Sequence, residues 1–166
     1  MDIDWDGRRL DTRELSISYV RAGAGAPVVF LHGWPEFKRT WLHTLPALAP
    51  HFDCIAPDLR GFGRTVTRAA RTGEGSPPTL LARDLLDLAD GLGLGKFAIV
   101  SHDVGATVAQ TVALTNPDRV SALFFFNCPY PGVGRRWGEH GHFRETWYQQ
   151  FHQKDFAAAL VGSSRE

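Results

Sequence analysis

A short stretch in the second half of the chain carries the residues best placed for chemistry. Apolar residues 97–100 predict a buried strand, and a helical pattern follows so soon that the turn between them must be very tight. The small residues Ser101 and Gly105 stand two positions on either side of Asp103. This spacing is typical of a nucleophile elbow, the sharp strand-to-helix turn that exposes one reactive side chain. An aspartate there can attack carbon and form an ester; the other interpretation is that Asp103 only caps the helix.

The elements that must position Asp103 follow from the hydropathy pattern. Apolar or alternating runs predict strands at residues 8–12, 15–20, 27–31, 52–56, 97–100 and 120–126. Helices are expected at residues 39–48, in a segment capped by Thr79, and after the elbow until Asn116 and Pro117 end it. Strands that alternate with helices predict an α/β fold with a mainly parallel sheet and helices on both faces.

Polar loops follow several of these strands at their carboxyl ends, where ligands bind in such sheets. They are residues 32–36 and 58–64, Asp103 and Asn127. We therefore expect these four features to meet on one rim of the sheet.

Composition excludes several other classes of protein. The 166 residues suffice for one domain with a core, and equal numbers of acidic and basic residues (18 each) argue against a nucleic-acid or membrane-surface partner. Cys54 and Cys128 lie in or beside predicted strands and are expected to be buried thiols. The acidic N-terminus resembles no signal peptide, and no apolar run approaches the ~20 residues that cross a bilayer. These features predict a soluble, cytoplasmic protein.

Three motifs together resemble the α/β-hydrolase fold, within it the branch of epoxide hydrolases and haloalkane dehalogenases. His32-Gly33-Trp34-Pro35 resembles the family's oxyanion loop, and residues 58–63 resemble its Asp-x-Arg-Gly-x-Gly loop. Residues 101–105 resemble the elbow with aspartate as nucleophile. The motifs stand in the family's order, and the resemblance covers nearly the whole chain.

Finer features favour the epoxide hydrolases. Many members of the family carry Trp after the nucleophile, and in some dehalogenases this Trp helps to hold the halide. Fluoroacetate dehalogenases carry Arg at this position. This chain has Val104, whose side chain can do neither. Asn127 stands where some dehalogenases place the triad acid, and Tyr148 matches the cap tyrosine that donates a proton to the epoxide oxygen. Two alternatives stay open: a haloalkane or haloacid dehalogenase with the same nucleophile, and a non-catalytic or partner-dependent hydrolase fragment. A serine esterase is disfavoured because Ser101 lies outside the nucleophile position.

The resemblance also implies a mechanism. Asp103 would attack the epoxide, Tyr148 would protonate its oxygen, and the backbone N–H groups of Trp34 and Val104 would form the oxyanion hole. The Trp34–Pro35 bond would be cis. Residues that support the motifs are His32, Gly33, Pro35, Ser101, His102 and Gly105. An apolar pocket for a small lipophilic epoxide, or a halogenated substrate, would be lined by Trp34, Phe62, Trp147 and Phe151. No metal and no cofactor are required.

The resemblance further divides the chain. Residues 1–130 match the N-terminal part of the hydrolase core, and residues 131–166 match the beginning of a helical cap domain. Strands seven and eight of the fold, with the base histidine and the triad acid, have no counterpart in these 166 residues, which suggests a truncated hydrolase. Residues 120–126 would then form an exposed apolar edge that invites self-association.

Overall fold

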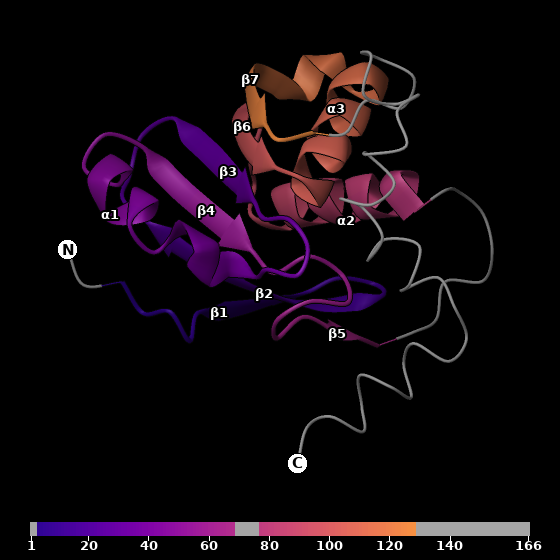
Figure 1. Ribbon diagram of the computed structural model, residues 1–166, viewed down its shortest axis with the longest axis horizontal. Helices are drawn as coiled ribbons and strands as arrows, with labels where there is room; N and C mark the ends of the chain where they lie inside the picture. Colours follow the sequence, from indigo (N-terminus) through magenta and orange to yellow (C-terminus); the bar gives the residue numbers. More distant parts are fainter. Residues whose placement is uncertain (1–2, 69–76, 129–166) are drawn as a thin grey trace, which may run out of the picture. The chain divides into compact units, whose positions relative to one another are not determined.

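A single mixed sheet forms the centre of the molecule (Figure 1). The computed structural model describes residues 3–68 and 77–128. Their strands are β1 (Arg8–Asp11), β2 (Leu15–Ala22), β3 (Pro27–Leu31), β4 (Asp53–Pro57), β5 (Val66–Thr67), β6 (Phe97–His102) and β7 (Val120–Phe126). The order across the sheet is β1-β2-β4-β3-β6-β7, with β5 paired to β2. Neighbours from β4 to β7 run parallel and the pairs that include β2 run antiparallel, which confirms the mainly parallel α/β fold.

Within the described residues, three α-helices and two 3-10 helices connect the strands. They are η1 (Lys38–Trp41), α1 (Thr44–Leu48), α2 (Pro77–Gly91), α3 (Val104–Thr115) and η2 (Pro117–Arg119). None of the helices in the described ranges is long and apolar enough to cross a membrane.

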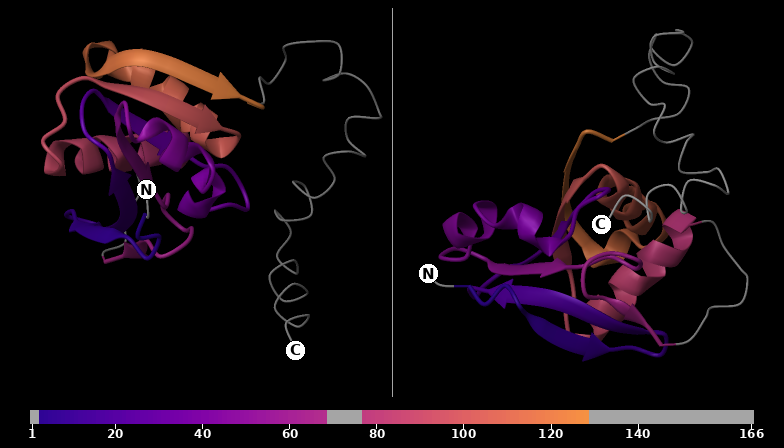
Figure 2. Two further views of the ribbon diagram at one scale, coloured as in Figure 1. Left: turned by 90° about the vertical axis from the view of Figure 1, so that its left-hand side faces the viewer. Right: turned by 60° about the horizontal axis from the view of Figure 1, so that its bottom comes forward.

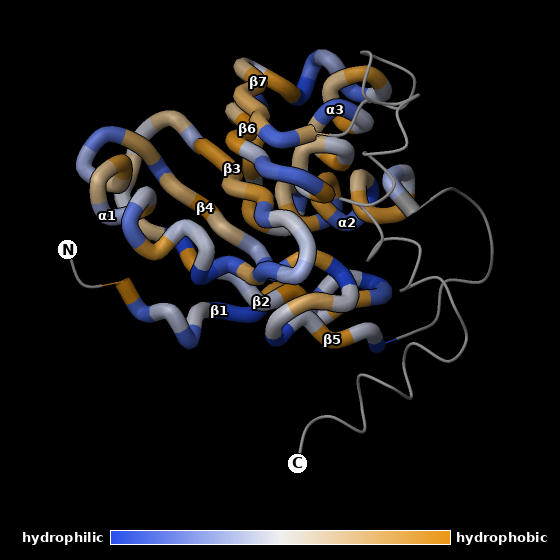
Figure 3. The backbone as a smooth tube through the Cα atoms, viewed as in Figure 1, coloured by the Kyte–Doolittle hydropathy of each residue, from blue (hydrophilic) through white to orange (hydrophobic). Residues whose placement is uncertain are grey.

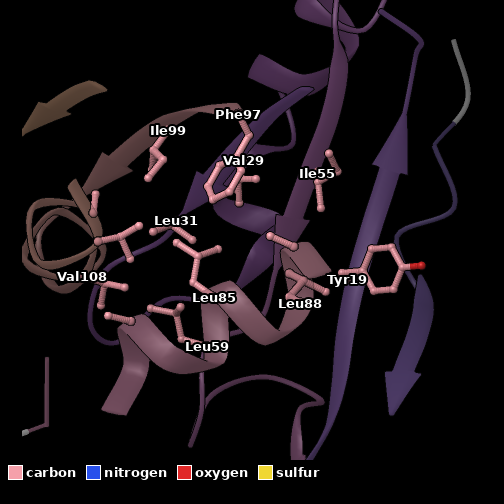
Figure 4. Packing of buried hydrophobic residues seen from close by; sticks show 14 of the residues in the cluster. Tyr19, Val29, Leu31, Ile55, Leu59, Leu85, Leu88, Phe97, Ile99 and Val108 are labelled. Atoms are coloured by element: carbon pink, nitrogen blue, oxygen red, sulfur yellow. The ribbon is translucent and has the colours of Figure 1, made fainter. Parts of the chain in front are cut away.

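Helices cover both faces of the sheet because alternate residues of the central strands point to opposite sides. Val29 and Leu31 of β3 belong to the core under α2 and α3, where Leu85 and Leu88 of α2 pack against them (Figure 4). Val28 and Phe30, the alternate residues, belong to a second core under η1 and α1. Strand β3 is accordingly almost entirely hydrophobic (Figure 3).

Strand β7 lies at one edge of the sheet, beyond β6 (Figure 2). Among the described strands it pairs with β6 alone. Phe124 of this strand is 60% exposed, and Phe125 and Phe126 are also exposed. The predicted apolar edge is therefore present in the described part of the chain, whereas self-association through it stays a prediction.

Several predicted boundaries were wrong. The single helix expected at residues 39–48 is instead η1 followed by the short α1. Thr79 does not cap α2, which begins at Pro77, because a proline in the first turn removes only an N–H that has no helical partner. Ser101 and His102, expected in the turn, belong to β6, and Val66–Thr67, where no strand was expected, form β5.

Candidate active site

Asp103 forms the corner between β6 and α3. Its φ and ψ are 50° and −117°, a conformation that costs a non-glycine residue about 1–3 kcal/mol. Although it occupies the N-cap position of α3, its side chain makes no capping hydrogen bond. The interpretation that Asp103 merely caps the helix is therefore wrong. The carboxylate instead accepts a backbone N–H from another part of the chain.

Small residues make this corner possible. A Cβ atom at Gly105 would lie 2.6 Å from the carbonyl oxygens of both Leu31 and His32, so a larger residue cannot fit there without moving backbone. A Cβ atom at Gly33 would lie 2.6 Å from the Cβ of Asp103. Ser101 is fully buried, and its hydroxyl donates to the Phe124 carbonyl at 3.3 Å. The close approach of β3, β6 and α3 thus depends on these three side chains being small or absent.

The loop at residues 32–36 meets the turn at Asp103 directly. The Trp34 N–H donates to Oδ1 of Asp103 at 3.0 Å, across 69 positions of sequence. The Trp34–Pro35 peptide bond is cis, as the resemblance implied. Val104 opens α3, so its N–H is one of the helix N-terminal amides that have no acceptor within the helix. The Asp103 carboxylate thus accepts one backbone amide from the loop at residues 32–36, while the Val104 amide follows Asp103 at the start of α3.

His32 joins the same loop to the segment after β4. It is fully buried, its Nε2 accepts the Leu59 N–H at 3.0 Å, and its Nδ1 lies 2.8 Å from the Gly33 carbonyl oxygen. Burial lowers the pKa of His32, so the ring stays neutral near pH 7. The Phe62 ring packs edge-on against it, with centroids 5.2 Å apart, and is partly buried against the core. His32 and Phe62 therefore fill the space beneath the loop.

A second set of polar contacts links three strand ends. Oε2 of Glu36 accepts the Gly33 N–H at 2.9 Å and lies 3.2 Å from Nδ1 of His102. Nε2 of His102 in turn lies 3.2 Å from Nδ2 of Asn127. Burial raises the pKa of Glu36, but the hydrogen bonds from Gly33 and His102 outweigh it and lower the pKa overall. Glu36 was not among the predicted site residues, although its place beside Pro35 in the motif could have indicated it.

The loop after β4 is anchored by a buried ion pair. Nζ of Lys38 lies 2.8 Å from Oδ2 of Asp58, and the two side chains are 2% and 0% exposed. Asp58 also accepts the backbone N–H groups of Lys38 and Arg64, while Nζ of Lys38 donates to Ser18. The carboxylate thus accepts three hydrogen bonds, two from Lys38 of η1 and one from the backbone of its own loop. Sequence alone did not indicate this pairing.

The features expected on one rim are therefore connected by hydrogen bonds: Trp34 to Asp103, His32 to Leu59, and His102 to Asn127. Trp34, named for the substrate pocket, is 41% exposed at this rim. Trp147, Tyr148 and Phe151, with the cap domain, lie outside the described residues. Within the described ranges, no group of three His, Cys, Asp or Glu side chains could hold a metal ion.

Comparison with known proteins shows which family the chain resembles. The family model described as alpha/beta hydrolase fold matches residues 26–160. Epoxide hydrolase 1 of Caenorhabditis elegans is 31% identical over 164 residues, which are 96% of this chain and 40% of that protein. The soluble epoxide hydrolase of a Corynebacterium species is 40% identical over 115 residues, 69% of this chain and 38% of that protein. This chain thus spans less than half the length of these two relatives.

A solved epoxide hydrolase structure has a similar fold. The epoxide hydrolase CorEH, determined without ligand, superimposes with a TM-score of 0.83 and 32% identity over 98% of this chain and 56% of that one. The resemblance inferred from the three motifs is confirmed.

Proposed function

Since the chain belongs to the alpha/beta hydrolase fold family, we propose that it carries the nucleophile half of an epoxide hydrolase site, with Asp103 attacking the substrate. The observation that carries the proposal is the hydrogen bond from the Trp34 N–H to Oδ1 of Asp103, made on an elbow whose carboxylate makes no capping bond. That bond orients the carboxylate and leaves Oδ2 to react. The names of the two relatives described above support an epoxide as the substrate class.

The first step opens the ring. Oδ2 of Asp103 forms a bond to one ring carbon while the bond from that carbon to the epoxide oxygen breaks. The oxygen leaves as a developing alkoxide, and we propose that Tyr148 donates the proton that neutralises it. The product is a hydroxyalkyl ester of Asp103, and ring strain supplies part of the driving force. A positioned proton donor of this kind typically accelerates the step by about 100-fold or more.

The second step would release a vicinal diol. Water would attack the ester carbonyl and give up a proton to a general base, and the oxyanion that forms would lie between the N–H groups of Trp34 and Val104. Its collapse would break the bond between the carbonyl carbon and the substrate oxygen, which takes up a proton as the diol leaves and the Asp103 carboxylate is restored. Val104 can serve because only its backbone is used. The ester is therefore an obligatory intermediate of the proposed reaction.

Intact-protein mass spectrometry after incubation with styrene oxide tests the proposal. We expect one adduct per chain, localised to the peptide that contains Asp103. Asp103→Asn should abolish it, because asparagine keeps the shape of the side chain and tolerates a φ of 50° but is not a nucleophile. Asp118→Asn, which changes an exposed aspartate of η2, is the matched control and should keep the adduct.

Two outcomes would overturn the proposal. They are the absence of an adduct on protein whose circular dichroism shows it folded, and an adduct that survives Asp103→Asn. A haloalkane offered in parallel separates the alternative: an Asp103 ester formed from the haloalkane but not from styrene oxide would favour a dehalogenase.

A further inference from the structure

The Gly33–Trp34 peptide is held at both of its ends. Its N–H donates to Oδ1 of Asp103 at 3.0 Å. Its carbonyl oxygen, that of Gly33, lies 2.8 Å from Nδ1 of His32 and accepts the Glu36 N–H at 3.1 Å. Because a peptide unit is planar, the groups that fix the direction of the carbonyl also fix the direction of the N–H.

The contacts of His32 allow one neutral form of its ring. The Leu59 N–H can only donate, so Nε2, 3.0 Å away, must be the unprotonated acceptor. A neutral imidazole then carries its proton on Nδ1, which faces the Gly33 carbonyl oxygen as a donor. Protonation of Nε2 would place two donors against each other inside the core.

We propose that His32 is a positioning residue for the nucleophile: its Nδ1–H orients and polarises the Gly33–Trp34 peptide so that the Trp34 N–H meets Asp103. This inference rests on the proposed function, in which that N–H first orients the carboxylate and later binds the oxyanion. Hydrogen bonds in series strengthen one another, so donation to the Gly33 carbonyl makes the Trp34 N–H a better donor.

The far side of the ring is anchored firmly enough for this task. Leu59, which donates to Nε2, directly follows Asp58, and Asp58 is held by the buried Lys38 and by backbone N–H groups. His32 therefore transmits the position of a rigid loop to the oxyanion loop. The low pKa that burial gives to His32 supports this role, because a ring that stays neutral keeps Nε2 as an acceptor.

Two isosteric variants separate positioning from simple filling of the core. In His32→Asn the amide nitrogen can reach the place of Nδ1 and donate to Gly33, but nothing accepts from Leu59. In His32→Gln the amide oxygen can reach the place of Nε2 and accept from Leu59, but nothing donates to Gly33. Both variants should lose stability. We expect the saturating rate constant for Asp103 alkylation by styrene oxide to fall about tenfold in His32→Gln and to be largely retained in His32→Asn, with half-saturating concentrations unchanged.

A second measurement does not depend on activity. Two-dimensional NMR of protein labelled with ¹⁵N in its histidines reports which ring nitrogen carries the proton, and the His32 signals are identified by their loss in both variants. We expect the proton on Nδ1, and we expect the Trp34 amide resonance to move in His32→Gln but not in His32→Asn.

A proton on Nε2, or equal alkylation rates and equal Trp34 amide shifts in the two variants, would overturn the positioning role. If wild-type protein forms no adduct, the proposed function fails, and the NMR experiment then decides the role of His32 by itself. The two failures are therefore distinguishable.

Discussion

Replacing Gly33 by alanine tests how closely the loop at residues 32–36 approaches Asp103, the nucleophile that we propose. The added Cβ would lie 2.6 Å from the Cβ of Asp103 and 3.0 Å from its Oδ1. Carbon atoms in contact are normally about 3.5–4.0 Å apart, so the loop and the elbow must separate by roughly 1 Å. The backbone of Gly33 lies outside the left-handed region, so alanine adds no backbone strain of its own. The effect therefore comes from displacement alone.

A displacement of about 1 Å at a reacting group can cost about 100-fold in rate. We expect Gly33→Ala to slow the alkylation of Asp103 by styrene oxide by about that factor, measured as adduct formation over time by intact-protein mass spectrometry. Gly95→Ala is the matched control, because a Cβ at Gly95 meets no atom within 4 Å, and it should react like the wild type. Circular dichroism sets a temperature at which all three proteins are folded.

Alkylation of Gly33→Ala at the wild-type rate would refute the reasoning. It would mean either that the loop relaxes without moving the Trp34 N–H or that this N–H does not orient Asp103. A loss of rate in Gly95→Ala as large as in Gly33→Ala would also count against it.

Two further predictions concern buried charge and a buried thiol. Lys38→Met should lower the free energy of unfolding by about 3–5 kcal/mol in urea titrations, because it leaves the Asp58 carboxylate buried without its cation. Arg68→Met, which breaks an exposed ion pair with Asp11, should cost about 1 kcal/mol or less, and similar losses in the two variants would contradict this account. Burial raises the pKa of Cys54 to about 11, so at pH 8 its thiol should resist iodoacetamide in the folded protein and react in urea. Peptide mass mapping would detect the label, and equal labelling in both conditions would contradict the predicted burial.

The hydropathy pattern predicted the central strands well. The strands expected at residues 27–31 and 120–126 have those bounds in the structure, and the one expected at 52–56 is shifted by a single residue. For the two central strands the reason is that burial on both faces of the sheet requires hydrophobic side chains. The helix boundaries near prolines were less predictable. Pro46 lies within α1 without ending it, and α2 begins at Pro77.

Some features of the candidate site could also be predicted from the sequence, and others could not. A tight strand-to-helix turn at Asp103 could be inferred from the sequence alone, since its requirement for small residues on both sides of Asp103 is local. The side-chain contacts around this turn could not be predicted in the same way. Glu36 and His102 are 66 positions apart, and Lys38 and Asp58 are 20 apart, so no periodicity connects them.

The sequence by itself therefore determined the order of the strands along the chain, the elbow and the family that its motifs indicate. Only the tertiary structure decided which polar groups meet: the Trp34 N–H with Asp103, the neutral His32 between two backbone segments, and the buried Lys38 with Asp58. The physical reason is that a hydrogen bond or ion pair depends on distance and direction in space to within a few tenths of an ångström. Local sequence dictates the elements, but their packing sets those distances.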